Sequence, residues 1–305
     1  MLIYQMNRAH RSYSRMFIVT DKLVSYAEAI YQATEQAMEN DPNVFVYGLG
    51  VDDSKGMYGT TKDLHLKFGK DRCFDTPISE DSMTGFGIGA ALAGMRPIHV
   101  HQRMDFLLLC MNQLINLASK MSYVSAGEYK LPLVIRAIIG RSWGQGAQHS
   151  QSFHSFFMHV PGIKVIAPST PYDAKGALMS AINDNNPTIF LEHRMLYQNV
   201  GQVPSEPYTV DFNKARILSK GNDVTIVAIS HMVVESLRAR DLLIQKGIKA
   251  EVIDPVSLSP LDIDTIYNSV LKTKKIVVVD TSWISAGTGS EIIASLSEKN
   301  SDSSP

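Results

Sequence analysis

Short apolar runs alternate with amphipathic segments along most of the chain. A continuous apolar run predicts a buried strand, and apolar residues three and four positions apart predict a helix. The first part yields strands at 44–48, 97–101, 131–139, 163–167 and 188–192, and helices at 26–40, 64–68, 85–94, 105–125 and 172–184. The later part adds strands at 224–229, 250–253 and 275–280, and helices at 233–246, 261–271 and 289–296. This alternation predicts an α/β fold with two doubly wound units, and the helix at 105–125 is apolar enough to be buried on most sides.

Two stretches interrupt the alternation. Residues 1–21 hold several arginines and no acid before Asp21, which indicates a disordered tail or an organelle-targeting segment; the composition favours the tail. Residues 201–214 contain proline and glycine with few apolar residues, which is typical of a linker. We therefore predict a first unit at 22–200 and a second unit at 215–305.

Composition narrows the class of protein. The chain has 305 residues, of which 45% are hydrophobic, and its net charge is 29 − 30 = −1, so a nucleic-acid partner is not expected. No apolar run is long enough to cross a bilayer. Cys73 and Cys110 stand in apolar contexts and are expected to be reduced core residues. These features favour a cytoplasmic protein, with the mitochondrial matrix as the alternative if the tail is a targeting segment.

The segment Asp75-Thr-Pro-Ile-Ser-Glu80 carries the first candidate site residue. Pro77 keeps the preceding residue extended, so Glu80 arrives at the start of the small-residue helix at 85–94. Such a helix lets another backbone or a flat ligand approach closely. A single acid in an apolar, tightly packed setting is suited to exchanging a proton near neutrality. The glycines there match a loose dinucleotide fingerprint, but no buried strand precedes them, so a nicotinamide site is not favoured.

His149 is the second candidate. It ends a glycine-rich loop that follows the predicted strand at 131–139, and ligands collect at the carboxyl ends of parallel strands. A lone histidine is more often structural, but this location favours function. No metal-ligand spacing of His and Cys, such as Cys-x-x-Cys or His-Glu-x-x-His, occurs in the sequence.

Five motifs identify a family. They are Thr76-Pro-Ile-Ser-Glu80, Gln148-His-Ser-Gln151, His159-Val-Pro-Gly-Ile-Lys-Val165, Asp173-Ala-Lys175 and Asp184-Asn-Asn-Pro187. In order and spacing they resemble the β subunit of thiamine-diphosphate-dependent 2-oxoacid dehydrogenases, the E1 components of the pyruvate, branched-chain 2-oxoacid and acetoin complexes. The resemblance covers roughly residues 22–297. It implies a pyrimidine-binding transketolase-like domain followed by a transketolase C-terminal-like domain.

The resemblance also implies roles for particular residues. Glu80 matches the glutamate that hydrogen-bonds N1′ of the aminopyrimidine, where it favours the tautomer able to take a proton from the thiazolium. Ile78 matches the apolar wall of that pocket, and Phe106 matches an aromatic position near the pyrimidine ring. His149 matches a histidine that assists substrate binding or acyl transfer to a lipoyl group. The implied reaction is oxidative decarboxylation of a 2-oxoacid such as pyruvate.

The same resemblance implies two metal sites, one for a monovalent cation and one for Mg²⁺. In some members Leu133, Ala181, Asp184 and Asn186 match positions that hold a monovalent cation such as K⁺, largely through backbone carbonyls. The Mg²⁺-diphosphate signature, Gly-Asp-Gly followed by Asn-Asn, is absent from the 305 residues. Because diphosphate needs a carboxylate-bound metal, an α subunit is expected to supply that half of the site in an α2β2 tetramer. A lipoyl-bearing acyltransferase core is a further expected partner.

Three departures from the family pattern keep alternatives open. Leu49 and Gly50 stand where a pair of acids is common, Asp81 follows Glu80 directly, and the sequence ends at Pro305, before the usual last strand and helix. One alternative is a two-chain transketolase-like enzyme that passes an activated aldehyde to a sugar or aldehyde acceptor. Another is a non-catalytic subunit that stabilises its partner.

Overall fold

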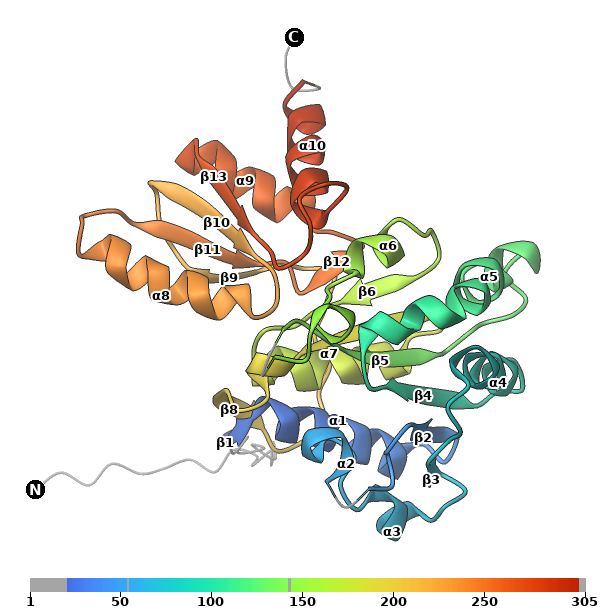
Figure 1. Ribbon diagram of the computed structural model, residues 1–305. Coiled ribbons are helices and arrows are strands. Elements are labelled where there is room, and N and C mark those ends of the chain that lie inside the picture. Colours follow the sequence, from blue (N-terminus) through green and yellow to red (C-terminus); the bar gives the residue numbers. More distant parts are fainter. Residues whose placement is uncertain (1–20, 54, 142–143, 302–305) are drawn as a thin grey trace, which may run out of the picture.

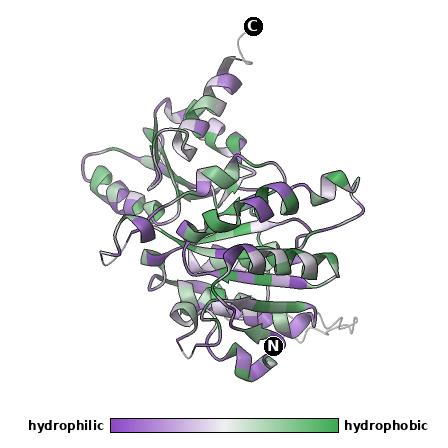
Figure 2. Ribbon diagram, turned by 45° about the vertical axis from the view of Figure 1, so that its right-hand side comes forward, coloured by the Kyte–Doolittle hydropathy of each residue, from purple (hydrophilic) through white to green (hydrophobic). Residues whose placement is uncertain are grey.

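The computed structural model describes residues 21–301 apart from residues 54, 142 and 143, so the predicted tail lies almost entirely outside the described residues. Two α/β units are present, as the alternation of apolar runs predicts (Figure 1). The larger unit is built on a seven-stranded sheet and the smaller on a four-stranded sheet. The hydropathy colouring shows the apolar positions concentrated in the strands and on the helix faces that cover them (Figure 2).

The seven-stranded sheet has the order β12-β6-β7-β5-β4-β2-β3, and all its neighbours are parallel except β12 and β6. Its strands are β2 (Val44–Gly48), β3 (Cys73–Phe74), β4 (Arg96–His101), β5 (Val134–Ile139), β6 (Lys164–Ile166), β7 (Thr188–His193) and β12 (Ser257–Ser259). Strands β2, β4, β5 and β7 are almost wholly buried, which explains their high apolar content; the polar residues within them, such as Arg136 and Glu192, are buried as well.

Helices cover both faces of this sheet. On one face lie α1 (Tyr26–Asn40) and α7 (Pro171–Asn183), which pack against each other. Ser25 caps α1 by accepting from the amide of Glu28, and Thr170 caps α7 in the same way. On the other face lie α4 (Glu80–Leu92) and residues 104–124. Shorter helices are α2 (Gly56–Gly59), α3 (Leu64–Phe68), η3 (Ala147–His149), α6 (His154–Met158) and η4 (Arg194–Leu196).

The prediction of one regular helix at 105–125 is wrong. The segment begins as a 3₁₀ helix, η1 (Met104–Cys110), widens into the π-helix η2 (Gln113–Ala118) and ends in α5 (Met121–Val124). Only part of its apolar surface is covered, since Leu109 is 61% exposed and Tyr123 is 87% exposed. The apolar content of the segment is therefore not explained by burial within this chain.

The smaller unit has the sheet order β13-β10-β11-β9, in which β9 is antiparallel. Its elements are β9 (Arg216–Ser219), β10 (Val224–Ala228), α8 (Met232–Ile244), β11 (Ala250–Asp254), α9 (Ile263–Thr273), β13 (Ile276–Val279) and α10 (Thr288–Ser301). Helix α8 covers one face, and α9 and α10 cover the other. No helix among the described residues is long and apolar enough to span a membrane.

Several contacts join the two units. Strand β12 belongs by sequence to the second unit, yet it pairs with β6 of the first sheet. The imidazole Nε2 of His154 lies 2.9 Å from the carboxylate of Asp280 across the junction. The predicted linker 201–214 begins inside strand β8 (Val200–Pro204), which pairs with β1 (Asp21–Ser25). Short antiparallel strands at the ends of a domain give no long apolar run, and so the sequence pattern did not predict them.

Candidate functional site

Glu80 is the first residue of α4, at the junction of an extended segment and a helix, where the sequence places it. The carboxylate is half-buried, and the neighbouring side chain of Ile78 is 80% exposed. The tightly packed apolar setting expected for Glu80 is therefore not formed by this chain alone. Asp81 is exposed and its carboxylate accepts a hydrogen bond from the amide of Ser82 at 2.7 Å, so that second acid serves the local backbone.

The small-residue face of α4 packs on Tyr47 of β2. A Cβ added at Gly87 would lie 2.1 Å from the hydroxyl oxygen of Tyr47, and that hydroxyl donates to the carbonyl of Met83 at 2.9 Å. Close packing within the chain thus accounts for Gly87, and no ligand is needed there.

Cys110 lies near the first turn of α4. Burial raises the pKa of its thiol to about 11, and the nearby charge of Glu80 adds to the shift. Cys110 is consequently protonated near neutrality and does not act as a nucleophile.

Phe106 and His149 lie together although 43 positions separate them (149 − 106 = 43). Their ring centroids are 5.3 Å apart, with the planes at 79°, in an edge-to-face contact. Both side chains are half-buried, and both belong to 3₁₀ turns that follow buried strands. Since α4 also packs on η1, Glu80 and this ring pair belong to contacting elements on one side of the sheet.

Two buried residues that the sequence analysis missed support this contact. Arg103 and Asp105 form an ion pair at 3.3 Å, and together they bond to Gly140 and Gln151 at the two ends of the loop that carries His149. A base and an acid two positions apart within an otherwise apolar stretch was the available signal. Their partners are distant in sequence and could not be deduced from it.

A cavity of about 1000 Å³ lies beside the His149 loop, between the two units. It is lined by Gly140, Arg141, Gly144, Ser150, His193, Met195, His231, Met232, Glu235, Asp280 and Thr281. Burial lowers the pKa of His193 to about 3, with the neighbouring ring of His231 as a further cause, so this imidazole is neutral. Among the described residues the cavity wall includes neither Glu80 nor Phe106. The cavity is therefore distinct from the place where those two residues lie.

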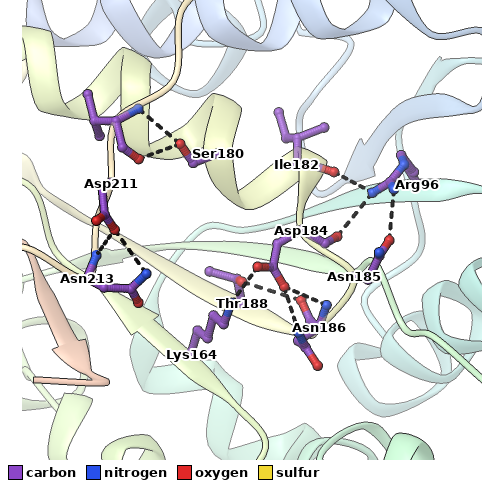
Figure 3. Close-up of polar contacts among 11 residues, drawn as sticks. Arg96, Lys164, Ser180, Ile182, Asp184, Asn185, Asn186, Thr188, Asp211 and Asn213 are labelled. Carbon is purple, nitrogen blue, oxygen red and sulfur yellow. Dashed lines mark hydrogen bonds and ion pairs between the residues drawn. The ribbon is translucent and has the colours of Figure 1, made fainter. Parts of the chain in front are cut away.

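Two of the four residues matched to a cation site, Asp184 and Asn186, lie in the turn between α7 and β7 (Figure 3). Ala181 belongs to the last turn of α7, and Leu133 directly precedes β5. The carbonyl of Leu133 accepts from the amide of Thr188 at 2.9 Å, and the carbonyl of Ala181 accepts from the amide of Asp184 at 3.2 Å. The carboxylate of Asp184 accepts from the amide of Asn186 at 2.8 Å and forms an ion pair with Lys164.

Cationic side chains of this chain already occupy the turn. Arg96 donates to the carbonyls of Ile182 and Asp184 at 2.7 and 3.1 Å, so two protein cations already neutralise the turn (Figure 3). Each carbonyl oxygen has two lone pairs, and those of Leu133 and Ala181 each keep one for a ligand. Within the described part of the chain, no cluster of three or more His, Cys, Asp or Glu residues could hold a metal ion.

Comparison with known proteins identifies the family. The family model of the transketolase pyrimidine-binding domain matches residues 22–200, and that of the transketolase C-terminal domain matches residues 213–303. The pyruvate dehydrogenase E1 component subunit beta of Porphyra purpurea is 45% identical over 271 residues, which are 89% of this chain and 82% of the relative. The chain belongs to the 2-oxoacid dehydrogenase β-subunit family.

Other relatives show the breadth of that family. The acetoin:2,6-dichlorophenolindophenol oxidoreductase subunit beta of Cupriavidus necator is 43% identical over 281 residues, which cover 89% of this chain and 83% of the relative. A solved split-gene transketolase chain, from an inactive β4 tetramer, superimposes with a TM-score of 0.75 and 24% identity, covering 90% of this chain and 84% of that chain. At that identity the transketolase chain shows the shared fold alone.

Proposed function

We propose that the chain is the catalytic β subunit of a thiamine-diphosphate-dependent 2-oxoacid dehydrogenase that acts with an α subunit on pyruvate or a related 2-oxoacid. The observation that carries the proposal is the position of Glu80 on the first turn of α4, on an element in contact with the segment that bears Phe106. This arrangement lies inside the region that matches the pyrimidine-binding domain. The half-open setting of Glu80 suits a ligand that a partner chain also encloses.

The residues present fit the pyrimidine half of the cofactor. When bound, thiamine diphosphate supplies an electron sink for decarboxylation and an aminopyrimidine that relays a proton. Glu80 would hold a proton at N1′ of that ring, a task for which a half-buried carboxyl group is chemically suited. The exposed side chain of Ile78 and the ring of Phe106 would flank the pyrimidine. His149, held against Phe106, would orient the substrate or the acyl acceptor.

The diphosphate half fits a different chain. The 305 residues contain no Gly-Asp-Gly, and binding a diphosphate requires metal-bound carboxylates. Apolar side chains are exposed on α4 and on residues 104–124, namely Phe86, Leu92, Leu108, Leu109, Leu117, Tyr123 and Val124. An exposed group of this kind is typical of a protein interface. We assign this side of the molecule to the α subunit, in an α2β2 tetramer that passes the acyl group to a lipoyl-bearing partner.

The test is reconstitution with the α subunit and thiamine diphosphate, followed by turnover of pyruvate and other 2-oxoacids. Glu80→Gln keeps a hydrogen bond to the ring but cannot supply the proton, and it should lower kcat by roughly 10²- to 10⁴-fold. Asp81→Asn is the matched control and should stay within about threefold of wild type, because its carboxylate bonds only locally. Near-native turnover of Glu80→Gln would remove Glu80 from the reaction.

The cation at the α7–β7 turn is tested by repeating the assay with choline in place of K⁺. If K⁺ binds there, it should raise the midpoint of thermal unfolding above the value measured with choline.

A further inference from the structure

We infer that Arg103 and Asp105 form a clamp that positions His149, and that the reaction depends on this clamp through His149 alone. The inference rests on the proposed function for its kinetic consequence. Its structural part, that the clamp fixes the loop, stands on the contacts themselves. Both are positioning residues, because neither is placed to touch substrate or cofactor.

The clamp connects the two ends of the loop that carries His149, at Gly140 and Gln151. The guanidinium Nη2 of Arg103 donates to the carbonyl of Gly140 at 2.8 Å, at the start of the loop. At its end, Oδ1 of Asp105 accepts from the side-chain amide of Gln151 at 2.9 Å and from its backbone amide at 3.3 Å. The amide of Gly140 donates to the carbonyl of Gln151 at 3.3 Å, and the ion pair between Arg103 and Asp105 completes a ring of contacts.

The clamp residues stand close in sequence to Phe106 and His149, whose rings are in contact. Phe106 directly follows Asp105, and His149 stands two positions before Gln151. The carboxylate of Asp105 therefore ties the residue before Phe106 to Gln151, two positions after His149. The edge-to-face contact at 5.3 Å follows from that arrangement. Removing the carboxylate would free the end of the loop while leaving both rings in the chain.

The burial of Arg103 and Asp105 indicates that the ion pair fixes the position of the loop rather than adding stability to the fold. The side chains of Arg103 and Asp105 are 5% and 3% exposed, and burial lowers the pKa of Arg103 despite the opposing charge of Asp105. Desolvating both charges costs several kcal/mol, so apolar residues at the two positions would hold the fold as well or better. Within the described residues, Nη1 of Arg103 has no hydrogen-bond partner, which adds to that cost. What apolar residues could not supply is a directed bond to each end of the loop.

Backbone geometry gives the first end of the loop little freedom. Gly140 has φ +83°, and a Cβ there would lie 2.0 Å from Nε2 of His193. The chain is thus pressed against the His193 ring on one side and held by Arg103 on the other. Movement of the loop should accordingly begin at Gln151, the end held by Asp105.

The experiment uses the reconstituted αβ pair and measures amide hydrogen exchange together with turnover. In Asp105→Ala the amides of Gly140 and Gln151 should lose at least tenfold protection, and kcat should fall about 10²-fold, the effect of a misplacement of about 1 Å. Asp105→Asn keeps the acceptor oxygen and should be intermediate on both measures. Ile266→Ala is the control: it truncates a buried side chain of α9 in the core of the smaller unit, and should change neither.

A double mutant separates positioning from general damage. If Asp105 acts through His149, adding Asp105→Ala to His149→Ala should lower kcat by less than threefold, because the group being positioned is already gone. Fully additive losses, or unchanged exchange at Gly140 and Gln151, would overturn the clamp. If the wild-type pair shows no cofactor-dependent turnover, the proposed function fails and hydrogen exchange alone decides the clamp.

Discussion

The two faces of the large sheet are built from similar apolar residues but are completed differently. The face covered by α1 and α7 encloses its polar groups: Arg136 and Glu192 are 1% and 2% exposed and form a two-bond pair at 2.6 and 3.1 Å. The hydroxyl of Tyr197 donates to the same carboxylate at 2.9 Å. On the opposite face, α4 and residues 104–124 leave large apolar side chains in solvent. We call these the closed face and the open face.

The difference between the two faces indicates which surface this chain covers by itself and which surface a partner is expected to cover. The closed face is covered by helices of the same chain, so its apolar residues are explained by stability. The open face contains an irregular helix, exposed leucines and the half-buried Glu80, which burial in this chain does not explain. Helices with 3₁₀ and π turns occur at functional sites more often than elsewhere. The open face is therefore where a second subunit and a cofactor are expected.

A large stability effect should come from the closed face. Glu192→Ala leaves the buried guanidinium of Arg136 without its partner, and should lower the free energy of unfolding by about 3–5 kcal/mol. Urea denaturation of the chain measures it. Glu235→Ala breaks an exposed pair with Arg238, at 2.7 Å on α8, and should cost less than about 1 kcal/mol. Equal losses in the two variants would mean that the closed face is not as enclosed as its contacts indicate.

The sequence predicted the closed face better than the open one. Helix α1 and strand β2 fall at the predicted residues, because regular periodicity and end signals such as the cap at Ser25 are local properties. One helix buried on most sides was predicted at 105–125, because apolar content does not show whether a side chain is covered by its own chain or left at the surface. Glu80 and His149 were named from their motifs, and their roles remain predictions. The Arg103–Asp105 pair was missed because its partners lie in a distant loop.

A smaller effect should appear on the open face, and on association rather than folding. Leu109→Ser removes an exposed apolar side chain, so unfolding of the isolated chain should change by no more than about 0.5 kcal/mol. If the α subunit covers this face, its dissociation constant should rise at least about tenfold, as expected for a truncated interface anchor worth more than about 1.4 kcal/mol. Analytical ultracentrifugation of the mixed subunits measures that change.

A leucine of nearly equal exposure supplies the comparison for this variant. Leu242 on α8 is 62% exposed, against 61% for Leu109, but it lies on the smaller unit away from the open face. Leu242→Ser should leave association with the α subunit unchanged. A weakening of association in both variants, or in Leu242→Ser alone, would move the interface away from residues 104–124.

A pH-dependent effect concerns the buried carboxyl group of Asp254. Asp254 accepts from the hydroxyl of Ser169 and, at 2.8 Å, from the amide of Val256, and burial raises the pKa of Asp254 to about 7. Between pH 4 and pH 7 the unfolded chain loses this proton while the folded chain keeps it, so the contribution of Asp254 to stability falls as the pH rises. Asp254→Asn does not titrate there, and its amide oxygen can still accept from Val256. The urea midpoint of the variant relative to wild type should therefore rise from pH 4 to pH 7 and level off above it. A difference that stays flat across this range would mean that the folded chain holds Asp254 ionised, with its two donors compensating for burial.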